Sequence, residues 1–545
     1  MNRVFIILTL CALSYVRETQ SAAPESGVPL YDNLGTHHQK ISTTSPVAQQ
    51  YFDQGLRLTY GFNHDEAVAS FKKAAELDDK CAMCIWGQAL ALGPNINMPM
   101  DLKQEPAAYQ LAQKALALSK AVKTTVVERA LINALAQRYA KEPGDNRSAR
   151  DQAYAQAMRE AAQRFPANTD VTTLFAESLM DLQPWDYWTA DGQPKGAANE
   201  IVATLEATIK LDENQPGACH YYIHAVEASR APQRALPCAQ RLPDLMPGAG
   251  HLVHMPAHTF VRVGMYEEAI TANEHAAHTD EKYIQDRNPQ GMYPLMYYNH
   301  NLHFLYFANM TAGHSAAAIK TARQLTTNIP AAALKEVPPL ELFISAPLQA
   351  LARFGKWDEI LMEPTPLAGL NYTKGMWHFA RGLAYSAKNE ADKARAELAG
   401  LRKLTVDQPA DHMAGYNSSK VLLGIAADVL NADLEQRAGA FDAAIKLLQH
   451  ASMSEDGLTY DEPPDWFQPV RQRLGVTLLA AGKAADAEKV YLDDLSRNPE
   501  NGWSLYGLKL SLEAQKKSKD VAAVAQRFKK AWSGADVTLN ASVFR

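Results

Sequence analysis

The sequence predicts an all-α protein in which antiparallel helix pairs repeat along the chain and stack into a solenoid. Apolar residues recur at three- and four-residue spacing, and the alternating pattern of strands is missing. Ala235 and Ala269 occupy the same place in successive helix pairs, 34 residues apart. With 545 residues the chain is several times the size of a typical domain, which suits a long repeat array.

The composition is that of a globular protein and excludes several classes of function. The chain is 47% hydrophobic and 21% charged, so it carries enough apolar surface to fold. Lys and Arg total 54 against 60 Asp and Glu, a net charge of -6 without a long basic run. We therefore expect no nucleic-acid partner, because neutralising phosphates needs clustered cations.

The N-terminus predicts export. Residues 1–22 have the pattern of a signal peptide: Arg3 is followed by an apolar run over 4–16 and by the small residues of 21–23. This apolar run is too short to span a membrane, which takes about 20 apolar residues. We expect a secreted or periplasmic protein without stable membrane insertion after cleavage, with residues 23–47 as a leader.

Helix pairs begin directly after this leader. Within 49–77, small and aromatic residues take fixed places, namely Gly55, Ala67, Phe71 and Ala74. Similar frames fit 215–247, 250–280, 375–409 and the C-terminal set Gly475, Ala487, Tyr491 and Pro499. These spacings resemble the tetratricopeptide repeat (TPR) family over most of the mature chain. The resemblance implies a right-handed superhelical solenoid in which the small residues let neighbouring helices approach closely.

Two interruptions of the period divide the chain into three parts. One lies at 180–196 and the other at 283–298, and insertions in a solenoid are usually loops on one face. The expected organisation is an N-terminal repeat region, a histidine-rich central region with both insertions, and a C-terminal repeat region, at 48–179, 180–320 and 321–545.

Four cysteines remain after removal of the signal peptide. Cys81 and Cys84 form a CxxC pair that fits a redox pair, half of a metal site or a local disulfide. Cys219 and Cys238 lie on the two helices of one repeat, and we predict a disulfide between them. If they were free thiols, Cys219 would be a candidate soft metal ligand.

Histidines are concentrated in one part of the chain. Ten of the sixteen lie between His220 and His314, where uniform scatter would place about three. Seven of them form sets at helical spacing: His220 with His224; His251 with His254 and His258; and His300 with His303. Each set shares a helix face, although Pro256 predicts a kink in the second. His275 and His278 belong to another helix and are expected to face elsewhere.

The repeat frame brings these sets into register. The fifth and ninth places of two repeats one period apart hold His220, His224, His254 and His258. In the TPR family such places line the concave groove, so the resemblance implies that all seven imidazoles share this surface. We predict that the four surround one centre, with His251, His300 and His303 close by.

Imidazole clusters of this kind predict a transition-metal site, with copper, zinc or iron as the candidates. Glu227 follows His224 by three residues, where it can ligate the metal, orient an imidazole or act as a base on bound water. The alternative for Glu227 is an ion pair with Arg230 or Arg262 on the solvent side.

Two functions fit these patterns. One is an exported metal-dependent protein, such as an oxidoreductase or hydrolase, centred between His220 and His303. The other is a scaffold whose concave groove binds a peptide or partner protein without catalysis. The chain has no HExxH, Walker A or GxSxG motif, so any catalysis is expected to depend on the metal.

A narrower resemblance rests on five stretches, at 81–87, 93–97, 184–185, 219–227 and 250–258. They resemble a histidine-rich group of exported bacterial TPR proteins. This resemblance implies the fold and the location, and it implies no reaction.

Overall fold

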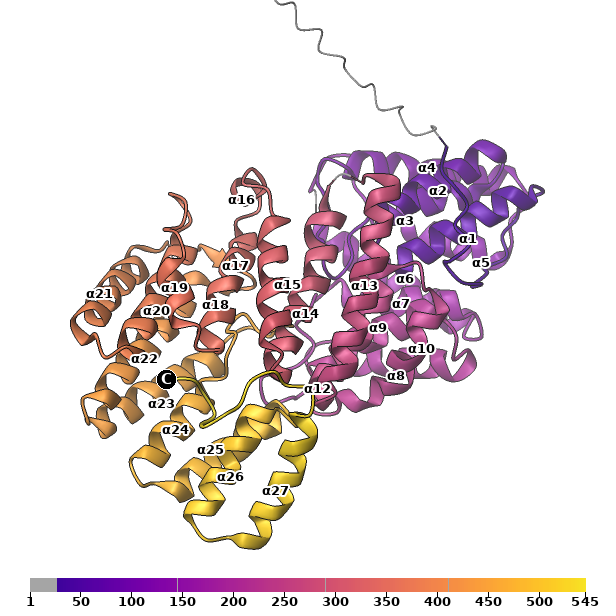
Figure 1. The fold of residues 1–545 in the computed structure, drawn as a ribbon. Coiled ribbons are helices and arrows are strands. Elements are labelled where there is room, and N and C mark those ends of the chain that lie inside the picture. The colour runs from indigo at the N-terminus through magenta and orange to yellow at the C-terminus, as the bar shows by residue number, and fades with distance from the viewer. Residues whose placement is uncertain (1–26, 145, 290, 410) are drawn as a thin grey trace, which may run out of the picture.

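The computed structural model describes residues 27–144, 146–289, 291–409 and 411–545. The predicted signal peptide lies outside these residues. The described chain is a TPR-like solenoid of antiparallel α-helix pairs, as predicted, in which consecutive helices pack side by side (Figure 1). No helix within the described part is both long and apolar enough to cross a membrane.

The helices follow one another along the chain in three groups. The N-terminal ones are α1 (Pro46–Tyr60), α2 (His64–Leu77), α3 (Ala82–Ala91), α4 (Glu105–Ala121), α5 (Val126–Leu135), α6 (Arg147–Arg164), α7 (Thr169–Met180) and α8 (Ala198–Leu211). The central ones are α9 (Pro216–Glu227), η1 (Pro232–Ala235), α10 (Leu236–Leu245), α11 (Gly250–His254), α12 (Pro256–Val263), α13 (Tyr266–Arg287), η2 (Tyr293–Tyr297), α14 (Tyr298–Ala312) and α15 (Ser315–Thr327).

The C-terminal part contains short helices and then four regular pairs. They are α16 (Ala333–Glu336), η3 (Pro338–Leu340), α17 (Glu341–Ile344), α18 (Ala346–Arg353), α19 (Trp357–Met362), α20 (Asn371–Ala387), α21 (Ala391–Asp407), α22 (Ser419–Arg437), α23 (Phe441–Asp456), α24 (Val470–Ala480), α25 (Ala484–Arg497), α26 (Gly502–Ala514) and α27 (Ser518–Ala531). A two-residue antiparallel ladder joins β1 (Met413–Ala414) to β2 (Asn417–Ser418), and it is the sole sheet among the described residues.

Glycines allow an aromatic ring to fill the space between three successive helices. Phe71 of α2 lies between Gly55 of α1 and Gly87 of α3, where an added Cβ would come within 2.8 Å and 2.3 Å of its ring. Tyr491 of α25 repeats this arrangement with the glycines sixteen residues before and after it, at 2.3 Å and 2.2 Å. The predicted role of the small residues in close helix packing is thus confirmed at both ends of the solenoid.

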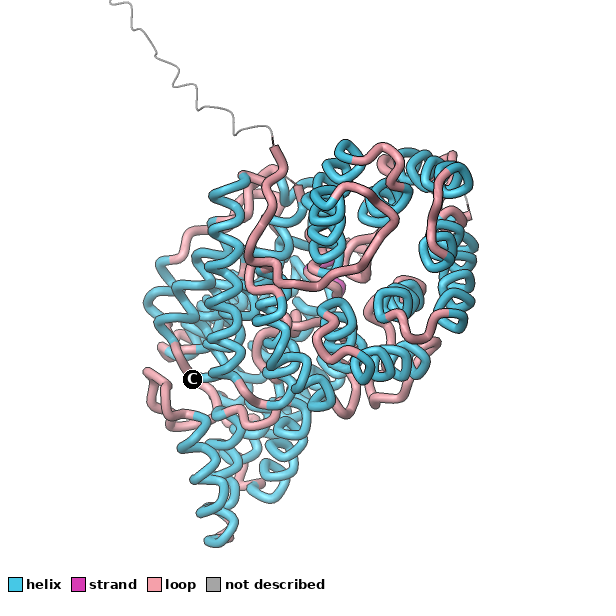
Figure 2. Tube along the Cα trace, turned by 90° about the vertical axis from the view of Figure 1, so that its right-hand side faces the viewer, coloured by secondary structure: helices cyan, strands magenta, loops and turns pink. Residues whose placement is uncertain are grey.

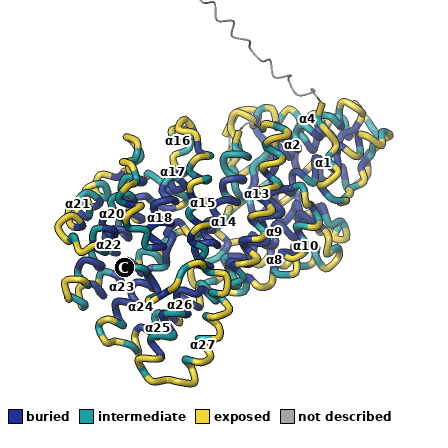
Figure 3. Tube along the Cα trace, viewed as in Figure 1, coloured by how far each residue is buried: buried dark blue, intermediate teal, exposed yellow. Residues whose placement is uncertain are grey.

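The superhelix brings distant helices together twice. Figure 2 looks toward the N-terminal helices and shows them arranged as a ring, and α1 packs against α9. In the second half α14 packs against α26, and Trp503 Nε1 donates a hydrogen bond to Met310 O at 3.1 Å. The first contact helps to bury α9, and the second helps to bury α14. Figure 3 shows buried segments around both helices. The histidine-rich helices therefore lie in the interior, where the two turns meet.

Candidate metal centre

The face of α9 that carries the first histidines points into the protein. His220, His224 and Glu227 follow one another by four and three residues, so they share one helix face. Gln215 caps the helix, and its side chain accepts from the Ala218 N–H at 2.8 Å. The helix packs against α8 and α10 and also meets α1 and α12, which buries every residue of it.

Pro256 divides the next histidine-bearing segment into two helices, as its position predicted. His251 and His254 lie on α11, and His258 lies on α12. Met255, which links the two helices, keeps a helical backbone, so the three rings still lie next to one another. The ring centroids of His251 and His254 are 5.8 Å apart, and those of His254 and His258 are 4.8 Å apart. His300 of α14 comes within 4.8 Å of the His254 ring.

Six imidazoles thereby form one cluster of two groups. Triad A consists of His220, His224 and His251, and triad B consists of His254, His258 and His300. In each triad, one nitrogen from every ring lies within 4.8 Å of the others. The triads adjoin, since the ring centroids of His224 and His258 are 5.1 Å apart.

Four of these rings have Nδ1 bound to an oxygen acceptor. The acceptors are Tyr60 O at 2.6 Å for His220, Glu227 Oε1 at 3.0 Å for His224, Asn273 Oδ1 at 2.7 Å for His254 and Glu227 Oε2 at 2.5 Å for His258. The Asn273 amide is oriented by its own donation to Ala269 O at 2.7 Å. In the neutral form of each ring the proton lies on Nδ1 and the lone pair on Nε2, the arrangement usual for metal-binding histidines.

The Nε2 atoms of four rings form two hydrogen-bonded pairs, His220 with His251 and His258 with His300, whereas three ring nitrogens of the cluster have no partner. His224 Nε2, His251 Nδ1 and His254 Nε2 are buried without a hydrogen-bond partner. A buried polar atom without a partner costs about 1–3 kcal/mol, so its presence calls for an explanation. A transition metal explains it, because neutral imidazole nitrogens are good ligands for copper, zinc and iron.

Glu227 holds one ring of each triad. Its two oxygens accept from His224 and His258, and the residue is only 1% exposed. Arg262 Nε donates to the backbone oxygen of Glu227 at 2.9 Å. The alternative of an ion pair on the solvent side is therefore wrong. The geometry favours the orienting role among those considered for Glu227, since both oxygens already bind imidazole N–H groups.

Two aromatic residues cover the cluster. Phe62 packs on His220 with ring centroids 4.5 Å apart, and Trp185 packs on His224 at 5.1 Å. Both have a left-handed backbone, with φ of 57° and 64°, which is strained for bulky side chains and is often found at functional sites. Trp185 belongs to the insertion at 180–196, whose Trp188 is fixed on α9 by donating to Ala225 O at 2.8 Å.

The segment between α23 and α24 adds an acidic residue that the sequence analysis missed. Glu462 Oε2 lies 3.4 Å from His258 Nδ1, and Tyr460 donates a hydrogen bond to its other oxygen. Arg262 Nε lies 3.5 Å from Glu462 Oε1. The available signal was an unusually long connection, 457–469, rich in acidic, aromatic and proline residues.

Burial sets the protonation of the cluster. It lowers the pKa of five imidazoles well below the usual value, with further lowering by neighbouring imidazoles, in His220, His224, His251, His254 and His300. Burial alone would also lower the pKa of His258, but the carboxylates of Glu227 and Glu462 raise it to about 9. Five rings are therefore neutral at pH 7, as metal ligands must be, whereas His258 is protonated and has to release its Nε2 proton when a metal binds.

The arrangement differs from the predicted one in two respects. The predicted group of four divides, with His220 and His224 in triad A and His254 and His258 in triad B. Seven imidazoles were expected to line an open groove, whereas all but His300 are buried, because the covering loops come from distant parts of the chain.

His303 does not join either triad, although it follows His300 by one helical turn. It packs on Phe343 with ring centroids 5.2 Å apart, and burial lowers its pKa to about 3. His275 and His278 are exposed on α13, as expected.

The four cysteines among the described residues are paired. A disulfide joins Cys219 of α9 to Cys238 of α10, with Cα atoms 5.1 Å apart, so this prediction is confirmed. Cys81 and Cys84 form a second, local disulfide at the start of α3. Cys219 is thereby excluded as a soft ligand beside His220.

Fold and site together define an all-α solenoid with an enclosed cluster of six histidines. No protein-family model matches the chain, and no curated protein matches it. Among solved structures, similar chains include the human IFIT1 dimer with m7Gppp-AAAA, at 12% identity and TM-score 0.34 over 90% of this chain and 91% of that one. Yeast Tom70 is similar at 12% identity and TM-score 0.28, over 89% and 93%.

Proposed function

We propose that this protein binds a transition metal through the Nε2 atoms of its buried histidines. The observation that carries the proposal is the pairing of anchored Nδ1 atoms with unsatisfied Nε2 atoms at His224 and His254. Buried neutral imidazoles of fixed tautomer are ready to bind a metal and lose little entropy in doing so. Solvated surface histidines would not show buried Nε2 atoms without a hydrogen-bond partner.

The donor set narrows the choice of metal. Both oxygens of Glu227 are occupied by imidazole N–H groups, and the nearest cysteine pair is a disulfide. The proposed ligands are therefore imidazoles, which suit copper, zinc and iron. For a given site, Cu²⁺ binds more tightly than Zn²⁺ or Fe²⁺.

We also propose that the protein acts in a secretory or periplasmic compartment. The signal-like pattern of residues 1–22 and the two disulfides support this, because disulfides persist in oxidising compartments. Sequencing the N-terminus of the mature protein tests it: cleavage near residue 22 is expected, and an intact first residue contradicts export by this signal.

Elemental analysis of protein purified without an affinity tag tests the metal proposal. Near-stoichiometric metal is expected in the native protein, and its amount should fall in a His254→Ala/His258→Ala variant. A His275→Ala/His278→Ala variant is the matched control, because both of its histidines are exposed on α13. Protein that takes up no copper or zinc would refute the proposal, and capture of a peptide by that metal-free protein would support the scaffold function instead.

A further inference from the structure

We propose that the cluster holds two metal ions, one in triad A and one in triad B. This inference rests on the proposed metal-binding function and specifies the number and the ligands of the ions. Triad A draws its ligands from α9 and α11, and triad B draws its ligands from α11, α12 and α14.

The nitrogen separations carry the inference. Two ligands bound at about 2.0–2.1 Å to one tetrahedral ion lie about 3.3 Å from each other. His220 Nε2 and His251 Nε2 are 3.2 Å apart in triad A. His258 Nε2 and His300 Nε2 are 3.3 Å apart in triad B. The cluster therefore contains this ligand pair twice, once in each triad.

The third ligand of each triad is an unsatisfied nitrogen. His224 Nε2 in triad A and His254 Nε2 in triad B are buried without a partner, and both rings are anchored through Nδ1. Each ion would thus have three imidazole ligands. Three protein ligands leave a coordination position for water or another small oxygen donor, as in catalytic rather than structural metal sites.

The two ions would be close enough to act together. The ring contacts between the triads, 5.1 Å for His224 with His258 and 5.8 Å for His251 with His254, fall in the range of those within the triads. Ions of two-metal sites are about 3.5–4 Å apart. The buried carboxylates of Glu227 and Glu462 face the cluster and supply negative charge for two cations.

Access to the pair is from the side of triad B. His300 is the one cluster histidine that is partly exposed, whereas the other five are buried. Phe62 and Trp185 cover the rings of His220 and His224 in triad A, so a peptide could reach these rings only by displacing one of the two side chains. The inferred ligand class is therefore a water-sized or dioxygen-sized molecule.

Titration of metal-free protein with Cu²⁺, and separately with Zn²⁺, tests the number of ions. Two ions per chain are expected by equilibrium dialysis with elemental analysis. His220→Ala should leave one ion, in triad B, and His300→Ala should leave one, in triad A. If His220→Ala fails to fold by circular dichroism, His251→Asn removes a nitrogen of the same triad. His303→Ala is the control and should keep two ions, because His303 contacts Phe343 outside both triads.

Electron paramagnetic resonance of the copper-loaded protein gives a second readout. Two neighbouring Cu²⁺ ions should give a broadened or strongly reduced signal, and each single-triad variant should give the sharp signal of one isolated ion. One ion in the native protein, lost in both variants, would overturn the two-ion inference and leave the metal proposal standing. No bound ion would overturn both.

Discussion

Substitution of Glu227 by glutamine should weaken one metal position far more than the other. The carboxylate accepts from His224 Nδ1 at 3.0 Å and from His258 Nδ1 at 2.5 Å, so it fixes one ring of each triad. Glutamine has the same shape but only one acceptor oxygen. Its NH₂ group must face the second imidazole, whose proton then favours Nε2, so the metal has to compete with that proton.

The magnitude follows from the loss of one outer hydrogen bond at one triad. Losing such a partner of a metal-binding histidine lowers affinity about 10–100-fold, equivalent to about 1.4–2.7 kcal/mol. This agrees with the about 1.5–3 kcal/mol of a hydrogen bond to a charged group. The triad that keeps its acceptor loses only the negative charge nearby, so its affinity should fall less.

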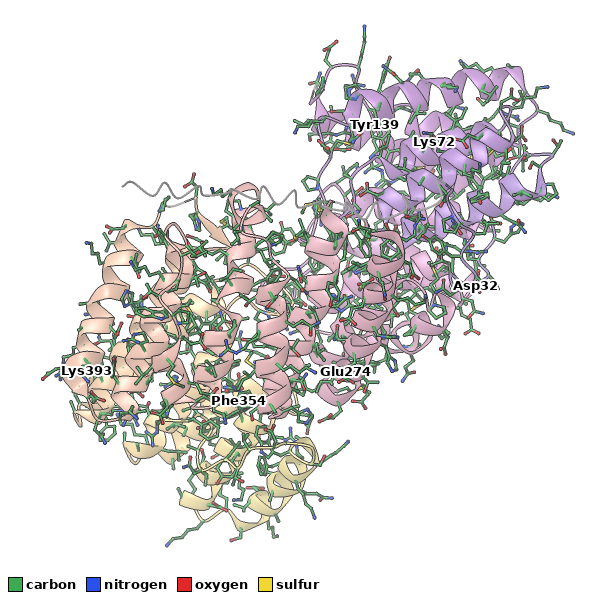
Figure 4. All side chains as sticks on the ribbon, turned by 45° about the horizontal axis from the view of Figure 1, so that its top comes forward. Asp32, Lys72, Tyr139, Glu274, Phe354 and Lys393 are labelled. Atoms are coloured by element: carbon green, nitrogen blue, oxygen red, sulfur yellow. A yellow bond between two sulfur atoms is a disulfide. The ribbon has the colours of Figure 1, made fainter. Side chains whose placement is uncertain are left out.

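Competition with a chromogenic chelator measures both affinities in one titration. Glu274→Gln is the matched control, since Glu274 is an exposed residue of α13 (Figure 4), and it should change neither affinity. If Glu227→Gln binds two ions within threefold of the native affinities, Glu227 does not orient the ligands and the reasoning fails. If the affinity of both metal positions falls equally, the glutamine does not affect one imidazole more than the other, and this explanation is wrong.

Three further predictions concern the fold. The Cys219→Ser/Cys238→Ser variant should lose about 3 kcal/mol of unfolding free energy in denaturant titrations, because the disulfide closes a loop of about twenty residues; no loss would mean that the native pair is not oxidised. Gly87→Ala should lower the free energy of unfolding by about 1–3 kcal/mol, since the added methyl meets the ring of Phe71 on α2. Gly424→Ala in α22 meets no neighbouring atom and should raise it by about 0.5–1 kcal/mol. Burial lowers the pKa of His64 to about 4, so the unfolded chain takes up the proton first as the pH falls below about 6.5. Relative to His64→Gln, the metal-free native protein should therefore be about 2 kcal/mol less stable at pH 5 than at pH 7.5; an equal difference at both pH values would contradict this.

The helix pairs could be predicted because their information is local. A glycine, an aromatic residue and a second glycine at sixteen-residue spacing fix how three successive helices approach, as around Phe71 and Tyr491. The face of each histidine was predictable for the same reason, since spacing of three or four residues places His220 and His224 together on α9.

The grouping of the rings was not predictable in this way. Register within a repeat gives the face of a helix, but it does not give the shift between neighbouring helices, and that shift pairs His220 with His251 rather than with His254. The residues that close the site come from far away in sequence. Phe62 and Glu462 are separated by about 400 residues, and only the superhelical turns bring both to α9 and α12.

This closure explains why the cluster is chemically unusual. Three ring nitrogens of the cluster are buried without a partner, which at about 1–3 kcal/mol each amounts to roughly 3–9 kcal/mol. A domain is stable by only about 5–15 kcal/mol, so such an arrangement is expensive for the metal-free chain. Binding of Zn²⁺ by structural sites provides about 10–16 kcal/mol, enough to offset it. Phe62 and Trp185 have a strained backbone and cover imidazole rings that water would otherwise hydrate. Both features lower the stability of the metal-free chain further, and a bound metal would offset this loss as well. The energetic balance therefore supports the proposed metal site over a hydrated binding groove.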